Sequence, residues 1–215
     1  MNLYTAIGLF VAAVALAITW YFWKTSASKK DVEEIKMILV GNDKYIAPST
    51  ATMPTSTVPT NDEKNALKHN QRGMILGEQG KHDEAEEEFR AAIKVKPDCA
   101  YAHYNLGITF GKGCKSEEAK KEYREAISIK GDFAAAYNNL GFEFDVKNDF
   151  VEAKKAYIRA IEIEPNYLTA LYNLANLLDN QNNREEARKY WEKVMGVETN
   201  CQDKERIIKR LAEKD

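Results

Sequence analysis

Side-chain amides recur along the chain at a constant spacing of 34 residues, at Gln71, Asn105, Asn139 and Asn173. A side-chain amide offers two N–H donors and one carbonyl acceptor, so it can bond to both the N–H and the C=O of a peptide backbone. A row of such groups would hold a main chain with little preference for its side chains. The alternative is a merely polar, hydrated face, and the choice depends on the elements that carry the amides.

The residue types that most often act in catalysis form no recognisable arrangement. The three histidines are His69, His82 and His103, and none stands beside a nucleophile in a known motif. His69 and His103 are also 34 residues apart, which indicates a shared packing role. The sequence has no phosphate-binding glycine loop. We therefore expect no catalytic residue, no metal site and no cofactor, and we do not expect an enzyme.

The cysteines and the charge balance exclude further classes. Cys99, Cys114 and Cys201 are odd in number and lack the CxxC spacing, which favours free thiols in a reducing compartment over disulfides or a zinc site. The formal net charge is −2, although 30% of the residues are charged. Binding of nucleic acid needs a concentrated basic surface, and none is visible, so we expect no nucleic-acid partner.

The elements that position these residues repeat with the same period of 34. Each copy has a small residue, an alanine preceded by Glu, an aromatic residue four positions further on and a helix-stopping or polar residue at its end. The small residues are Gly73, Gly107, Gly141 and Ala175. The alanines are Ala85, Ala119, Ala153 and Ala187, and the aromatic residues are Phe89, Tyr123, Tyr157 and Trp191. The copies end at Pro97, Gly131, Pro165 and Thr199.

Each recurrence has a physical reason in a pair of helices. A small residue on the first helix lets the second approach closely, and the aromatic residue is predicted to fill the space between adjacent pairs. Pro or Gly stops the second helix, and the next residue is predicted to N-cap the following helix. These predicted caps are Asp98, Asp132, Asn166 and Asn200. The turns within the pairs contain Gly80, Cys114, Asn148 and Asn182, of which Gly and Asn tolerate left-handed backbone.

The pattern closely resembles the tetratricopeptide-repeat (TPR) family over about residues 66–199. The resemblance implies an all-α superhelical solenoid of four helix–turn–helix repeats, at about residues 66–99, 100–133, 134–167 and 168–201. A capping helix is predicted at residues 201–214, and the whole TPR domain at 61–215. The sequence departs from the family at His69, His103, Tyr137 and Leu171, where Trp is common, and at Gly131 and Thr199, which replace a terminal Pro.

In this family the first helices line a concave inner face, along which extended peptides commonly lie. By family position, the four amides Gln71, Asn105, Asn139 and Asn173 point to that face, and so do the aromatic residues Tyr101, Tyr104, Phe142 and Tyr172. These eight are the predicted peptide-binding residues, with packing between repeats as the alternative for any one aromatic residue. Some family members clamp a chaperone's terminal carboxylate with Lys and Arg. The matching positions here hold no basic residue: Asn70, Met74, Asn105, Ala135 and Asn139.

The first sixty residues differ in composition. Residues 3–23 carry no charge, and as a helix rising about 1.5 Å per residue they would match the roughly 30 Å hydrocarbon core of a bilayer. Residues 1–23 are therefore predicted to be an N-terminal transmembrane anchor, favoured over a cleaved signal peptide because no basic residue precedes the apolar run. Lys24, Lys29 and Lys30 predict a cytoplasmic TPR domain, with a periplasmic or luminal side as the alternative. Residues 24–60 are predicted to be a juxtamembrane segment and a Pro/Ser/Thr-rich linker.

These features predict a membrane-tethered scaffold that binds a protein or an extended peptide in the concave groove and recruits or assembles a membrane-associated complex. Its second predicted partner is the lipid bilayer, contacted through residues 3–23. The alternative is a self-associating structural protein of a larger membrane complex or organelle, as the resemblance to magnetosome-associated members of the family implies.

Overall fold

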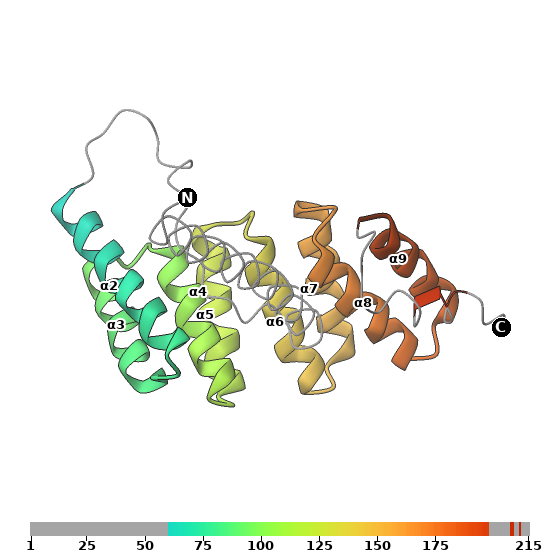
Figure 1. The fold of residues 1–215 in the computed structure, drawn as a ribbon, viewed down its shortest axis with the longest axis horizontal. Helices are drawn as coiled ribbons and strands as arrows, with labels where there is room; N and C mark the ends of the chain where they lie inside the picture. The colour runs from blue at the N-terminus through green and yellow to red at the C-terminus, as the bar shows by residue number, and fades with distance from the viewer. Residues whose placement is uncertain (1–59, 198–206, 209–210, 212–215) are drawn as a thin grey trace, which may run out of the picture.

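Paired α-helices make up the structure, a computed structural model that describes residues 60–197, 207–208 and 211. The eight helices in residues 60–197 are α2 (Asn61–Glu78), α3 (His82–Val95), α4 (Ala100–Lys112), α5 (Ser116–Ile129), α6 (Ala134–Val146), α7 (Phe150–Ile163), α8 (Leu168–Asn180) and α9 (Arg184–Val197). They pack as consecutive pairs, and the second helix of each pair also contacts the first helix of the next. Figure 1 shows the pairs following one another along the long axis of the molecule. The all-α solenoid of helix pairs predicted from the sequence is confirmed.

The first three pairs close where an aromatic ring of the second helix lies on a glycine of the first. A Cβ atom on Gly73 would stand 2.7 Å from the Phe89 ring, and one on Gly107 would stand 2.6 Å from the Tyr123 ring. Real Cβ atoms do not approach a neighbour that closely, so only glycine permits this distance between the helices. The aromatic residues thus pack within their own pair, whereas the sequence had predicted them between adjacent pairs.

The turns that join the two helices of each pair have the same geometry in all four pairs. One residue takes left-handed backbone, with φ of 78°, 57°, 61° and 59° at Gly80, Cys114, Asn148 and Asn182. The next N–H then donates back to a carbonyl near the helix end, as Lys115 N does to Phe110 O at 2.9 Å. This is the Schellman arrangement that satisfies carbonyls at a helix C-terminus. Cys114 adopts it without the conformational advantage of Gly or Asn.

The N-cap residues of α4, α6 and α8, the first helices of the second to fourth pairs, differ from those predicted. The N-cap residues of α4, α6 and α8 make no side-chain cap bond, and they are Cys99, Phe133 and Tyr167. The predicted caps lie one residue earlier, so that prediction is wrong for Asp98, Asp132 and Asn166, and Asn200 lies outside the described residues. The link before α4 is a tight turn in which the Cys99 N–H donates to the Lys96 carbonyl at 3.2 Å, and the helix begins only after this turn.

The two ends of the array differ in how their outer helix faces are covered. In the later pairs, the first-helix positions that face the preceding pair hold Ala and Leu and are buried, as Ala102 and Leu106 are in α4. The same positions in α2 hold Lys68 and Arg72, and both are exposed. At the other end, Ile207 is buried in the hydrophobic cluster of α8 and α9. Residues 207, 208 and 211 are helical, and the rest of the predicted capping helix at 201–214 lies outside the described residues.

The predicted localisation needs correction. Within the described residues, no helix has both the length and the apolar character that are needed to cross a bilayer. The proposed anchor at residues 1–23 and the linker at 24–60 lie outside the described residues, except for Thr60. The prediction of a single-pass membrane protein with a cytoplasmic TPR domain is corrected on this finding.

Candidate functional site

The asparagines that recur every 34 residues tie each helix pair to the pair before it. Each Nδ2 donates to the side chain that stands 35 residues earlier. The bonds run from Asn105 to Asn70 Oδ1 at 3.0 Å, from Asn139 to the Tyr104 hydroxyl oxygen at 3.3 Å, and from Asn173 to Asn138 Oδ1 at 3.1 Å. Three of the four predicted amides therefore form bonds between repeats. We call these three asparagines and Gln71 the amide row.

The amide row is held in place more firmly than a hydrated face would be. Asn105, Asn139 and Asn173 are 0%, 4% and 7% exposed, whereas Gln71 in the first pair is exposed. Asn139 also accepts from Asn138 Nδ2 at 3.1 Å through its own Oδ1, so both its amide nitrogen and its amide oxygen are bonded inside the array. The row consequently presents amides of fixed orientation, because rotation of any of the three asparagines would break a buried bond.

Three of the four predicted aromatic residues pack inside the array. Tyr101 lies edge-on to Phe133 with ring centroids 5.3 Å apart, and Tyr104 lies 4.8 Å from the same ring. Tyr172 packs edge-on to Trp191 at 4.9 Å. These contacts correspond to the packing alternative and brace neighbouring helices next to the amide row.

Phe142 is placed differently from the other aromatic residues. It is only partly buried, and it makes no aromatic contact within the described part of the chain. It follows Asn138 by four residues on α6, so the two side chains share one face of that helix. Phe142 is thus the predicted aromatic residue that can give apolar contact to a ligand at the least cost to the fold.

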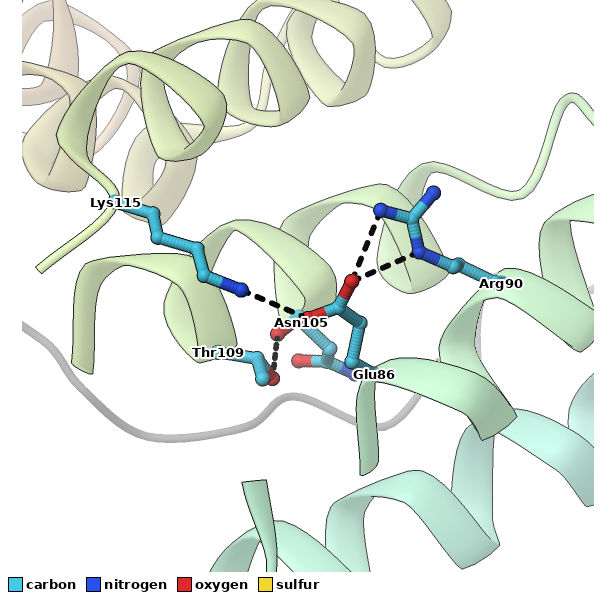
Figure 2. A network of polar contacts seen from close by, with 5 residues as sticks. All are labelled: Glu86, Arg90, Asn105, Thr109 and Lys115. Carbon is cyan, nitrogen blue, oxygen red and sulfur yellow. Dashed lines mark hydrogen bonds and ion pairs between the residues drawn. The ribbon is translucent and has the colours of Figure 1, made fainter. Parts of the chain in front are cut away.

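Polar contacts on the other side of α4 fix the helix that carries Asn105 (Figure 2). Glu86 on α3 accepts from Arg90 Nε at 3.0 Å and from Lys115 Nζ at 3.4 Å. Both cations also lie over the Phe110 ring, at 5.6 and 5.4 Å from its centroid. Exposed ion pairs contribute little to stability individually. Here the Lys115–Glu86 pair joins the turn after α4 to α3, and Arg90 of α3 lies over Phe110 of α4, while the Asn105 amide joins α4 to α2.

The two histidines at a shared repeat position both bond to a Glu of the second helix. His69 Nδ1 lies 2.6 Å from Glu88 Oε2, and His103 Nδ1 lies 2.7 Å from Glu122 Oε2. His103 Nε2 also lies 3.0 Å from the Pro97 carbonyl oxygen. Burial lowers the pKa of His103, but the bonds to Glu122 and to the Pro97 carbonyl outweigh this, and the pKa is raised overall. Among the described residues, no cluster of three His, Cys, Asp or Glu side chains could hold a metal ion.

Carboxylates on α6 and α8 were missed by the sequence reasoning. Ser116 Oγ donates to Glu143 Oε2 at 2.6 Å inside the array, and Trp191 Nε1 donates to Asp179 Oδ2 at 2.8 Å. A third carboxylate, Asp145, stands 34 residues before Asp179. The signal was present in the sequence, because α6 and α8 contain these acids and no Lys, Arg or His.

Helix pairs of 34 residues with a repeated glycine–aromatic contact and a repeated left-handed turn define a helical-repeat protein of the two-helix solenoid class. Comparison with protein families agrees with this class. A TPR-repeat family matches residues 73–113, and tetratricopeptide-repeat families match residues 100–133, 134–167 and 168–197. The chain belongs to the tetratricopeptide-repeat family.

Solved structures share this fold at low sequence identity. A crystal structure of MamA is 23% identical with a TM-score of 0.59, covering 67% of this chain and 81% of MamA. The pilF protein of Pseudomonas aeruginosa is 22% identical with a TM-score of 0.63, over 71% of this chain and 68% of its own. The first TPR domain of Spaghetti (RPAP3), solved with an HSP90 peptide, is 24% identical with a TM-score of 0.53, over 55% of this chain and 94% of its own. None of the curated proteins compared with the chain matches it.

Proposed function

We propose that this protein is an interaction scaffold that binds an extended segment of another protein along the amide row. The segment's backbone bonds to the exposed Gln71 and to the small exposed parts of Asn139 and Asn173, and its side chains contact the partly buried Phe142 and Tyr101. Asn105, Tyr104 and Tyr172 are fully buried, so they hold the repeats together and do not touch the segment. Backbone recognition of this kind gives broad specificity and a modest affinity, about micromolar, because polar groups must be desolvated on both sides.

The observation that carries this proposal is the set of bonds between repeats. Three asparagines in successive pairs donate to equivalent positions at 3.0, 3.3 and 3.1 Å, so the amides are oriented before a ligand arrives. Groups that are already ordered lose less conformational entropy on binding, which raises the affinity that a few hydrogen bonds can give. The equal sequence spacing of the amides suits a ligand that runs through successive repeats, which is an extended chain.

The charge of the groove residues indicates which kind of peptide can bind. The RPAP3 domain was solved with a chaperone tail of sequence SRMEEVD, which supports an extended peptide as the class of ligand. Here the positions that would clamp a terminal carboxylate hold Asn70, Met74 and Ala135 together with Asn105 and Asn139. We therefore propose an internal segment rather than an acidic chain end. The similarity to MamA shows only a shared fold and does not favour self-assembly.

The test uses a degenerate pool of eight-residue peptides capped at both ends, passed over the immobilised full chain and identified by mass spectrometry. Phe142→Ala and Gln71→Ala remove a partly buried and an exposed side chain, neither of which bonds between repeats, so both variants should fold normally. We expect each variant to retain clearly less peptide, with Phe142→Ala losing about tenfold, as for truncation of an aromatic contact residue.

Val151→Ala is the matched control, because Val151 is an exposed apolar residue on the second helix α7. It should retain as much peptide as the unmodified chain. Equal retention by Phe142→Ala, Gln71→Ala and Val151→Ala, with unchanged circular dichroism, would exclude the amide row as the binding site.

A further inference from the structure

A lysine in the link between the second and third helix pairs is held against two aromatic residues. Lys130 is the C-cap residue of α5, and its Nζ donates to the Tyr101 hydroxyl oxygen at 3.2 Å. The same Nζ lies 4.9 Å from the centroid of the Phe133 ring and 5.1 Å from that of the Tyr101 ring. The hydrogen bond and the cation–π contacts together fix the position of this ammonium group.

The equivalent lysine of the first pair has a carboxylate partner. Lys96 stands 34 residues before Lys130, and its Nζ lies 2.9 Å from Glu63 Oε1. The residue 34 positions after Glu63 is Pro97, which has no charge to offer Lys130. Among the described residues, no carboxylate forms an ion pair with Lys130. The same repeat position thus holds one lysine with a counter-charge from its own chain and one without.

The donors at this place are accessible to a ligand. Lys130 and Tyr101 are both half-buried, so part of each side chain faces solvent. An ammonium group has three N–H donors, and Lys130 uses one of them on the Tyr101 oxygen. Because that oxygen accepts from Lys130, the Tyr101 O–H is still able to donate, and it has no acceptor in the described part of the chain. Two donor groups side by side match the two oxygens of a carboxylate.

The acidic residues around Lys130 do not fill this place. Asp98 and Asp132, in the links before α4 and α6, are exposed, and neither pairs with Lys130 in the described structure. Glu122 on α5 is bonded to His103 at 2.7 Å. The ammonium group is therefore left for an anion from a partner.

Lys130 also lies where the proposed segment would pass. Tyr101 precedes Asn105 by four residues, so the two side chains share one face of α4. The hydrogen bond to Tyr101 consequently holds the Lys130 ammonium group beside the amide row.

We propose that Lys130 and the Tyr101 hydroxyl bind the side-chain carboxylate of a glutamate or an aspartate in the bound segment. This inference rests on the proposed function, and it adds the charge of one ligand residue to it. The carboxylate belongs to a side chain, because Lys130 stands at none of the positions that would clamp a chain end. It accepts from the ammonium group and from the phenol at once, and both bonds are strengthened by its charge. The partner is thus an internal segment with an acidic side chain next to its contact with Tyr101.

The experiment compares three pools of eight-residue peptides, capped at both ends and degenerate in uncharged residues, on the immobilised full chain. One central residue is fixed as glutamate, as glutamine (which has the same shape without the charge) or as lysine. We expect the glutamate pool to be retained roughly tenfold better than the glutamine pool, as for hydrogen bonds to one charged group, and the lysine pool least. Lys130→Gln should abolish the glutamate preference while glutamine peptides are still retained. Tyr101→Phe keeps the ring and removes the hydroxyl, so it should reduce the preference partly.

Lys121→Gln removes the same charge from an exposed position on α5 and should leave the preference unchanged. Equal retention of the glutamate and glutamine pools by the unmodified chain would overturn this inference and leave the proposed function standing. An equal loss of preference in Lys121→Gln and Lys130→Gln would also overturn it, because the effect would then be one of overall charge. So would a glutamate preference that neither Lys130→Gln nor Tyr101→Phe changes. Retention of no pool by the unmodified chain would overturn the proposed function together with the inference.

Discussion

At the scale of single residues, Cys114 is the residue whose type suits its backbone least. Its φ is 57°, and its equivalents in the other turns are Gly80, Asn148 and Asn182. Left-handed backbone costs most residues about 1 kcal/mol or more, whereas glycine adopts it freely. We expect Cys114→Gly to raise the free energy of unfolding by about 1 kcal/mol, measured by urea denaturation with an unchanged m-value.

The matched control is a substitution at the equivalent turn residue Gly80, and it should lower the free energy of unfolding instead of raising it. Gly80→Ala places a Cβ where the structure leaves open space, but at a φ of 78°, so it should destabilise the chain through backbone strain alone. If Cys114→Gly left the urea midpoint unchanged or lowered it, strain at this turn could not be the reason for the choice of residue in the other turns.

The roles of individual asparagines show where sequence reasoning reached its limit. The 34-residue spacing correctly placed Asn105, Asn139 and Asn173 at one repeat position. It did not reveal that Asn70 and Asn138 accept from them, because an acceptor 35 residues away becomes a neighbour only when two pairs stack. Spacing within a repeat defines a position, and contacts between repeats define what the side chain does there.

At the scale of helices, the periodic residues predicted the element type and the stacking of pairs. The contact of Tyr123 with Gly107 explains why this worked, since one small and one large residue at fixed spacing set the distance between two helices. The start of α4 was predicted less well. Asp98 has the side chain of a good N-cap, but the turn made by the Cys99 N–H and the Lys96 carbonyl decides where the helix begins.

His103 joins three parts of the second pair, because it bonds to Glu122 on α5 and to the Pro97 carbonyl in the link before α4. Both ring nitrogens face acceptors, so both must carry a proton, and this requires the imidazolium form. The pKa of His103 is raised in the folded chain. Its contribution to stability is therefore complete below the unfolded pKa of about 6.5 and is lost as the pH rises through the higher folded pKa.

We accordingly expect the free energy of unfolding to fall between pH 6 and pH 8 in the unmodified chain, and to fall less in His103→Gln. The difference should be on the order of 1 kcal/mol, the net value of a typical hydrogen bond. Glu122→Gln should flatten the same pH dependence by removing the charge opposite the ring. Parallel pH profiles for all three proteins, measured by urea denaturation, would show that this contact does not depend on protonation.

At the scale of the whole molecule, each helix pair packs on the next through an equivalent face, and the outer face of α2 is charged. Positions that hold buried Ala and Leu in α4, α6 and α8 hold Lys68 and Arg72 in α2, where Ile75 nearby is 55% exposed. A repeat presents the same apolar edge to each neighbour, so an uncharged terminal edge would attract a further copy. We therefore expect the two charges on α2 to oppose the addition of a further copy at this edge.

The double substitution Lys68→Ala with Arg72→Leu gives α2 the residues of the later first helices and should create an adhesive end. We expect sedimentation velocity to show larger species that increase with concentration, beyond any seen for the unmodified chain, because an apolar edge next to Ile75 is then open to a second copy. Lys155→Ala with Arg159→Leu makes the same two changes at the same spacing on exposed positions of α7 and should leave the distribution unaltered. If the α2 double variant sediments like the unmodified chain, or the α7 variant associates equally, then charge on the first edge is not what ends the stack.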